Sequence, residues 1–232
     1  MDLIAAQTLS QKLQISLEQV VREEYEILLL KEIFESEFGA NLVFKGGTAL
    51  RLVYNSPRFS EDLDFTLIKD FDREGFISEG KNSFTSFLKE LEHTYPAIIS
   101  VEAKEKYYTI FGLIKIKEDY LNLAFSIKVE VSKRKGEWIK DKDYSDKIIR
   151  SEVTPLTVLV QVAQLERILE EKEDAIKNRK APRDIFDYWY INQLLKKEVK
   201  VRFEGYDKTH TKAELHRLLS RTYWRIIDSW LE

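Results

Sequence analysis

The spacing of hydrophobic and polar residues changes several times along this chain, and each change predicts a different element. In the first third, helical spacing alternates with short apolar runs. The pattern predicts, in order, an amphipathic helix over 17–38 that ends near Gly39, a buried strand over 42–45, a helix over 47–54, a strand over 61–68 and a helix over 75–92. The apolar run 42–45 leads directly into a glycine pair, which marks a tight turn.

The period then shortens to two residues, which is typical of strands with one buried face. Three strands are predicted, over 98–105, 107–117 and 124–132. In the third, Ile127 and Val129 alternate with Lys128 and Glu130, so one face is apolar and the other polar. Residues 133–150 are highly charged and predict a loop with a short strand.

The remainder of the chain is mostly helical in pattern. The predicted elements are a strand over 157–162 and helices over 164–178, 183–197 and 211–231, the last opened by a capping box of Thr211 and Glu214. The fold class expected is therefore α+β, with a mixed sheet and its flanking helices in residues 1–150 and a mostly helical lobe in residues 151–232.

Composition narrows the class of protein. The 232 residues include 13 Phe, 11 Tyr and 4 Trp, no Cys and three His, with a net charge of −3. Disulfides, thiolate metal sites and a generally basic nucleic-acid surface are excluded. No apolar run has the length of a membrane span and the first residues do not resemble a signal peptide, so we expect a cytoplasmic protein with no membrane contact. Two basic clusters, at 133–135 and 177–183, are either solvated faces or local patches for RNA.

The residues between Lys45 and Phe65 carry the strongest chemical signal. Gly46 and Gly47 follow a predicted strand, where bare backbone N–H groups can hold a phosphate. Asp62 and Asp64 are two apart on the next predicted strand, so both carboxylates point to one face. Such a pair repels itself unless a cation neutralises it, which favours a metal site over surface decoration.

Further candidates depend on how the elements pack. If the strand of Glu130 lies beside that of Asp62 and Asp64, three carboxylates converge on bound Mg²⁺ (or Mn²⁺); otherwise Glu130 is an exposed partner of Lys128. Lys172 falls on the apolar stripe of its predicted helix, so it either meets an anion in a cleft or extends to solvent at the edge of the stripe.

Three residues near these motifs have two readings each. Asp184 either caps its helix or, as an alternative to Asp187, faces the cleft and orients Lys172 or a substrate hydroxyl. Thr48 either caps a helix or, with Lys45, flanks the phosphate cradle. Arg51 either contacts phosphate or pairs with a surface acid such as Glu61.

These motifs together resemble a known family. The segments GGTALR (46–51), FSEDLDF (59–65) and, later, Glu171-Lys172 with Arg183-Asp184 and Asp187 are similar to those of the AbiEii/AbiGii-type nucleotidyltransferase toxins. That family forms the toxin half of type IV toxin–antitoxin systems and belongs to the polymerase-β-like nucleotidyltransferase superfamily. The resemblance spans residues 40–190.

The resemblance implies a minimal nucleotidyltransferase domain whose cleft is closed by a helical lobe. It implies that Gly46, Gly47 and Thr48 hold a nucleoside triphosphate, that Lys172 contacts its phosphates, and that Asp184 is a catalytic acid, base or positioning residue. It also implies metal binding by Asp62 and Asp64, an RNA acceptor such as the tRNA 3′ end, and a cognate antitoxin.

We therefore expect a Mg²⁺-dependent nucleotidyltransferase that moves a nucleoside monophosphate from an NTP to an acceptor hydroxyl. Two alternatives remain at this point. One is transfer to a small molecule such as an antibiotic in the same fold. The other is a module that binds nucleotide, RNA or an antitoxin without turnover.

Overall fold

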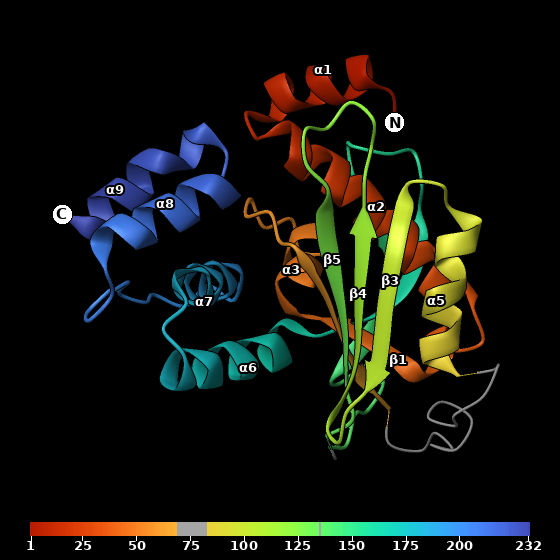
Figure 1. The fold of residues 1–232 in the computed structure, drawn as a ribbon. Coiled ribbons are helices and arrows are strands. Elements are labelled where there is room, and N and C mark those ends of the chain that lie inside the picture. Colours follow the sequence, from red (N-terminus) through yellow and green to blue (C-terminus); the bar gives the residue numbers. More distant parts are fainter. Residues whose placement is uncertain (69–82, 135) are drawn as a thin grey trace.

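The computed structural model describes residues 1–68, 83–134 and 136–232, and within them seven strands form one mixed sheet (Figure 1). The strands are β1 (Leu42–Lys45), β2 (Asp62–Leu67), β3 (Ile98–Glu105), β4 (Thr109–Ile116), β5 (Phe125–Ser132), β6 (Tyr144–Ile149) and β7 (Val158–Ala163). Their order across the sheet is β3-β4-β5-β2-β1-β7-β6. The fold is α+β, as the pattern of the sequence predicts.

The centre of the sheet joins segments that are distant in sequence. β2 pairs parallel with β5 and antiparallel with β1, and β1 pairs parallel with β7. β4 lies antiparallel between β3 and β5, and β6 pairs antiparallel with β7. The strand of Glu130 is therefore a direct neighbour of the strand of Asp62 and Asp64.

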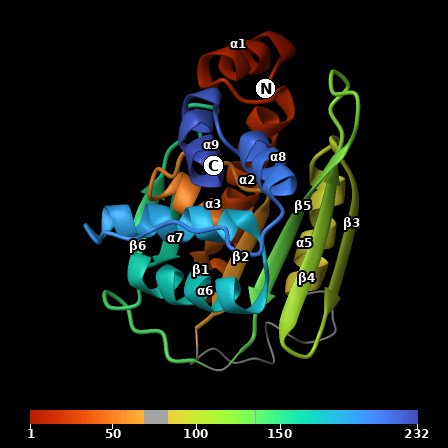
Figure 2. The same cartoon turned by 90° about the vertical axis from the view of Figure 1, so that its left-hand side faces the viewer.

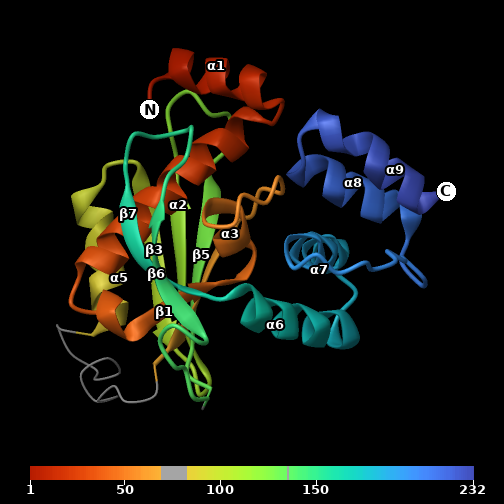
Figure 3. The ribbon, with the colours of Figure 1, turned by 180° about the vertical axis from the view of Figure 1, so that it is seen from behind.

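Helices cover one face of this sheet, and a helical lobe stands against the other near its centre (Figures 1 and 3). The helices are α1 (Leu3–Leu13), α2 (Leu17–Glu35), α3 (Gly46–Leu52), α5 (Phe84–Thr94), α6 (Leu165–Asn178), α7 (Pro182–Leu194), α8 (Lys208–Leu218) and α9 (Trp224–Leu231). α2 contacts β5 and β7 and α5 contacts β3, while Figure 2 shows α6 and α7 in front of β1 and β2.

Alternation along the strands separates a dry face from a polar one. On β5, Ile127 and Val129 are fully buried, while Lys128 and Glu130 on the opposite face remain partly accessible. The buried side chains join the main core, and the lobe has a second, smaller core around Phe186, Leu215 and Ile227. Burial of one face thus forces the polar residues of β2 and β5 toward the lobe.

Two expectations from the sequence change. The predicted helix over 211–231 is two helices, α8 and α9, because Leu219 leaves the helix to form a β-bridge with Arg58. The predicted capping box is wrong as well, since Asp207 caps α8 and accepts from the backbone N–H of His210, while Thr211 is buried inside the helix.

The sheet extends past residue 150, where the sequence pattern places the boundary between the two parts of the chain. β7 lies beside β1, so the sheet continues to Ala163 and the helical part opens with α6. The helix expected over 75–92 is observed from Phe84 onward, and residues 75–82 lie outside the described part, as does Lys135 of the first basic cluster. In the described ranges, no helix combines the length and apolar character needed to cross a bilayer.

Candidate active site

Three carboxylates of the sheet centre lie on its polar face. The pairing of β2 with β5 places Asp64 beside Glu130 and Asp62 beside Lys128, while β1 places Lys45 on the other side of Asp64. Side-by-side residues of neighbouring strands point to the same face. The register therefore brings Asp62, Asp64 and Glu130 to the same face of two neighbouring strands.

The carboxylate of Asp64 lacks a partner within the described chain. No hydrogen bond or ion pair reaches it from residues 1–68, 83–134 or 136–232, although Asp62 and Glu130 both have one. Burial, together with the nearby charge of Asp62, raises the pKa of Asp64 against the opposing attraction of Lys128, Lys45 and Lys172. An under-neutralised, partly buried carboxylate of this kind is a candidate ligand for a hard cation.

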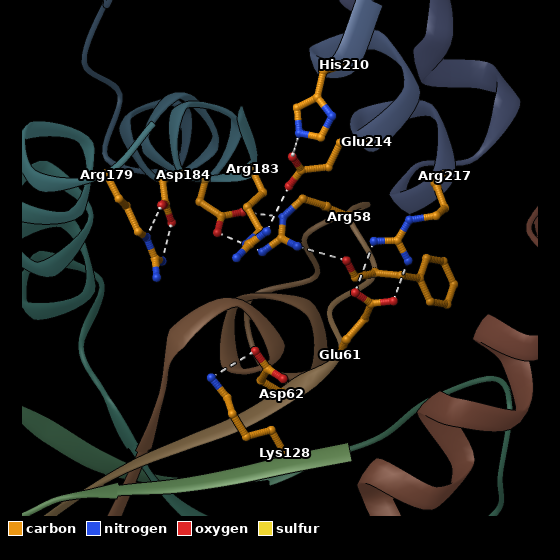
Figure 4. A network of polar contacts seen from close by, with 12 residues as sticks. Arg58, Glu61, Asp62, Lys128, Arg179, Arg183, Asp184, His210, Glu214 and Arg217 are labelled. Atoms are coloured by element: carbon orange, nitrogen blue, oxygen red, sulfur yellow. Dashed lines mark hydrogen bonds and ion pairs between the residues drawn. The ribbon is translucent and has the colours of Figure 1, made fainter. Parts of the chain in front are cut away.

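Lys128 occupies the space between the other two acids. Its Nζ lies 3.3 Å from Asp62 Oδ2 (Figure 4) and 3.5 Å from Glu130 Oε2. Over the described residues, no three acidic or imidazole side chains are already gathered as a closed metal cage. The donor set nevertheless suits Mg²⁺, because it consists of carboxylate oxygens on one face with an unpartnered member.

The glycine pair follows β1 and packs against these acids. Gly46 has a φ of +80°, and a Cβ built there would lie 2.5 Å from Asp64 Oδ2, so the position requires glycine. A side chain at Gly47 would run into the guanidinium of Arg58. Thr48 is fully buried, and its Oγ1 donates to the carbonyl of Asp62 at 2.5 Å, so it ties the glycine turn to β2 and does not cap α3.

Lys172 faces inward, as one of its two predicted readings requires. Only 7% of the residue is exposed, and its Nζ lies 2.9 Å from Asp184 Oδ1 and 2.7 Å from Asp187 Oδ2. Burial would lower the pKa of Lys172, but the attraction of these two carboxylates outweighs it and raises that pKa. The anionic partners of the lysine are therefore two aspartates of α7.

Asp184 is also held by Arg179, so it acts as the junction of the lobe. The Nε and Nη2 of Arg179 donate to its two oxygens at 2.8 and 3.1 Å. Burial opposes ionisation, but hydrogen bonds and charge from Arg179 and Lys172 lower the pKa of Asp184 to about 2. Ala181 occupies the N-cap of α7, so Asp184 is not a capping residue there.

Arg58 connects this lobe network to the glycine turn. It is 2% exposed and donates Nε and Nη2 to the two oxygens of Asp187, both at 2.7 Å. Attraction from Asp187 overcomes the effect of burial and raises the pKa of Arg58. The bidentate pair links the segment that enters β2 with α7, and so fixes the lobe relative to the carboxylates.

A cavity of about 180 Å³ opens between the sheet and α6. Its lining includes Lys45, Gly46, Asp64, Glu130, Lys172 and Arg179. A neighbouring hollow of about 390 Å³ shares Lys45, Glu171 and Arg179 with it and extends outward past Arg134, Trp138 and Arg167. Lys45 spans the cavity and pairs with Glu171 of α6 at 2.5 Å.

Arg51 lies elsewhere than in this cavity. Its Nε donates to Glu23 at 2.8 Å, and its guanidinium stacks on Phe59 with Cζ 3.9 Å from the ring centroid. Its acidic partner is therefore Glu23 of α2. Glu61 pairs instead with Arg217 of α8, a residue to which the sequence pattern assigned no role.

The sequence pattern assigned no role to Arg58, which directly precedes the segment 59–65. Its only sequence signal is a lone arginine between Pro57 and Phe59 ahead of an apolar strand, which does not identify a partner. In the basic cluster at 177–183, Arg179 and Arg183 are paired with Asp184 and Glu214.

The architecture is shared with a solved structure. The protein is similar in fold to JHP933 from Helicobacter pylori, with a TM-score of 0.56 and 20% identity over 87% of this chain and 74% of that one. A second H. pylori structure, a candidate nucleotidyltransferase, aligns with a TM-score of 0.49 and 19% identity over 92% and 96% of the two chains. No curated protein matches.

The family follows from the sequence over most of the chain. The model of the nucleotidyl transferase AbiEii toxin family, of type IV toxin–antitoxin systems, matches residues 28–223, so the chain belongs to that family. It is accordingly an enzyme of the nucleotidyltransferase type, and the resemblance drawn from its motifs is confirmed.

Proposed function

We propose that this protein transfers a nucleoside monophosphate from a nucleoside triphosphate to a hydroxyl of RNA, such as the tRNA 3′ end, with Mg²⁺ as the metal. The acceptor oxygen attacks the α-phosphorus, the bond between that phosphorus and the α–β bridging oxygen breaks, and pyrophosphate leaves with the electron pair. The hydroxyl proton passes to a base or to solvent. The role of toxin in a two-component system comes with the family.

One observation carries the proposal. Asp64 and Glu130 lie side by side in the lining of a cavity whose other walls supply Lys45, Lys172 and Arg179, and Asp62 lies two residues before Asp64 on the same strand. Anionic ligands next to cationic walls suit a metal-bound triphosphate, whose charge both must balance. A site that contains both acidic and basic side chains is poorly suited to an uncharged ligand.

Asp62 and Asp64 would hold the metal, with Glu130 as a third ligand, and Mn²⁺ would be a chemically similar substitute. When bound, the ion polarises the phosphoryl oxygens and neutralises developing negative charge. Lys128 holds two of these carboxylates together at 3.3 and 3.5 Å, and so limits their mutual repulsion.

The remaining residues would orient the triphosphate. The backbone N–H groups of Gly46, Gly47 and Thr48 supply donors beside Asp64, since side chains are excluded there. Lys172 and Arg179 line the cavity, and Asp184 fixes both of their head groups. Lys45 lines it as well, and its link to Glu171 joins the sheet to the lobe. Arg51 acts in this proposal only through Glu23 and Phe59, as a support of α3.

The outer hollow has room for the base and sugar. Arg167 lies over the ring of Trp138 with its Cζ 4.8 Å from the centroid, which leaves a planar surface beside the cavity. Bases stack readily on such surfaces. The two hollows together fall within the size range of ligand sites.

The proposed substrates and a cognate antitoxin would all be met in the cytoplasm. Under this proposal, residues 1–150 form the catalytic domain with six of the seven described strands, and residues 151–232 contribute β7 and the helices that close the site. α6 and α7 carry the residues of that wall, Lys172, Arg179 and Asp184.

The test is incubation of purified protein with Mg²⁺, total tRNA and each of the four NTPs in α-³²P-labelled form. We expect label on RNA with at least one NTP, and its loss in Asp64→Ala. Label on a small hydroxylated acceptor and none on RNA would favour the alternative of antibiotic-type transfer. Tight NTP binding with no transfer to any acceptor would favour a binding module.

A further inference from the structure

A second hollow lies on the other side of the catalytic carboxylates. It encloses about 600 Å³ between the N-terminal helices and the C-terminal pair α8–α9, which Figure 2 shows close to each other. One wall is polar and uncharged and includes Ser10, Gln11 and Gln14. The other wall consists of His216, Arg217, Leu219, Arg221 and Trp224, and we call this hollow the α1–α8 groove.

The groove contains an ordered aromatic surface. The rings of His216 and Trp224 stack with centroids 4.4 Å apart and planes 5° from parallel. The indole N–H of Trp224 donates to the carbonyls of His216 and Leu219, both at 3.2 Å, so the ring has a fixed position. Arg221 lies over the same ring, with Cζ 5.8 Å from the centroid. Aromatic rings beside arginines bind bases of single-stranded nucleic acids by stacking.

The two charged side chains that line the groove are both arginines, of which Arg217 is paired with Glu61. Arg217 and Arg221 line it, whereas none of its described lining residues is a carboxylate. The chain as a whole has a net charge of −3, so this cationic surface is local. Cationic side chains next to stacking rings match a ligand of alternating phosphates and bases.

The groove leads to the carboxylates from the side opposite the cavity. Arg217 pairs with both oxygens of Glu61, which directly precedes Asp62, with Nη2 at 3.1 Å from Oε2. The backbone N–H of Phe59 donates to the carbonyl of Leu218 at 2.8 Å, so α8 is fastened to the segment that enters β2. Figure 4 shows Arg217 and Glu61 on one side of Asp62, and Arg179 and Asp184 on the other.

This placement fits the geometry of the reaction. In an in-line displacement, the attacking oxygen approaches the phosphorus from the side opposite the leaving group. A triphosphate in the cavity between β1, β2 and α6 would leave the Asp62 side for the acceptor. An acceptor that enters through the α1–α8 groove arrives at that side.

We infer that the α1–α8 groove binds the single-stranded 3′ end of the RNA acceptor. Bases stack on the His216–Trp224 pair, Arg221 contacts a phosphate, and Arg217 with Glu61 marks the inner end next to Asp62. The inference rests on the proposed function, because it names the place where the proposed acceptor enters.

The test is fluorescence anisotropy with a labelled single-stranded RNA of about eight nucleotides and a free 3′ hydroxyl, at low and at higher salt. Arg221→Glu reverses the charge on one wall, and Gln11→Glu adds a negative charge to the other. Arg202→Glu is the matched control, since Arg202 is 66% exposed, pairs with Glu204 and does not line the groove. Binding of a fluorescent ATP analogue with Mg²⁺ is measured on the same preparations.

We expect Arg221→Glu to weaken RNA binding by about tenfold or more and to reduce its salt dependence by about one phosphate contact. Gln11→Glu should weaken it in the same direction, while Arg202→Glu binds like wild type and all variants bind nucleotide normally. Three results would overturn the inference. They are an RNA affinity that is unchanged in both groove variants, an equal loss of RNA affinity in Arg202→Glu, or no RNA binding by a wild type that binds nucleotide. Failure of the wild type to bind nucleotide would instead count against the proposed function.

Discussion

Arg58 and Asp187 form a buried bidentate ion pair, with Nε–Oδ1 and Nη2–Oδ2 distances of 2.7 Å, between the entry to β2 and helix α7. The pair joins two parts of the chain that are 129 residues apart. Because Arg58 also lies against Gly47, the position of the lobe and the position of the glycine turn depend on each other.

Removal of one partner should therefore destabilise the whole protein. In Asp187→Ala, Arg58 loses both of its side-chain acceptors while it remains buried, and we expect a loss of about 3–5 kcal/mol in the free energy of unfolding. Urea denaturation measures it. The control Glu204→Ala breaks an exposed pair and should cost no more than about 1 kcal/mol. A loss for Asp187→Ala as small as that of the control would contradict the role given to the pair.

Low pH should reduce the free energy of unfolding through the protonation of Asp184. The pKa of Asp184 is about 2 in the folded state, below the value of about 3.9 for an unfolded chain, so its ionised form contributes stability above the unfolded value. That contribution, on the order of 2 kcal/mol, is lost as the pH falls through the folded pKa. Unfolding free energies between pH 7 and pH 2 measure it.

The matched comparison is Asp184→Asn against Asp119→Asn, which removes an exposed carboxylate. We expect the first variant to flatten the decline below about pH 4 and the second to follow wild type. Identical acid profiles for Asp184→Asn and wild type would show that Asp184 does not carry this dependence.

The first effect of Gly46→Ala should be a displacement of the Asp64 carboxylate. The added Cβ meets Asp64 Oδ2 at 2.5 Å and the backbone has a φ of +80°, which together should cost about 1–3 kcal/mol. We expect lower stability and a loss of Mg²⁺-nucleotide binding, measured by calorimetry. Gly136→Ala adds a Cβ whose nearest neighbour, Trp138 Nε1, lies at an ordinary contact distance of 3.7 Å, and should change the stability by less than about 0.5 kcal/mol. Equal stability of both variants would rule out the close approach at Gly46.

Lys128 should compete with Mg²⁺ for the carboxylates. In Lys128→Met, Asp62 and Glu130 lose their shared cation, so we expect about 0.5–1 kcal/mol lower stability in EDTA and a larger rise in Tm on addition of Mg²⁺. Thermal unfolding with and without Mg²⁺ measures both. If neither wild type nor variant responds to Mg²⁺, the three acids do not form the metal site.

Much of this fold follows from local patterns, and the exceptions have physical causes. The strand over 124–132 was predicted because strict alternation needs only neighbouring residues. The division of the helix over 211–231 could not be, because Leu219 is extended through its bridge to Arg58, a contact made only in the folded chain. Such tertiary contacts override the local propensity for helix.

In the candidate site, too, some features follow from local patterns and others depend on contacts made only in the folded chain. Alternation placed Glu130 on the polar face of its strand, but only the register of β2 against β5 brings it beside Asp64. The inward direction of Lys172 was readable from its apolar stripe, whereas its partners on α7 depend on how two helices pack. Pairs across the fold, such as Arg58 with Asp187, leave no trace in spacing.

The most direct test of the central claim compares two labels on one substrate. Wild type and Asp64→Asn are incubated with Mg²⁺, tRNA and the preferred NTP, labelled with ³²P either at the α- or at the γ-phosphate. We expect α-label to appear on RNA and γ-label to be released as pyrophosphate. Asp64→Asn should reduce the rates of both processes by a factor of about 100 or more. Transfer of the γ-label to RNA, or undiminished α-transfer by Asp64→Asn, would contradict the central claim.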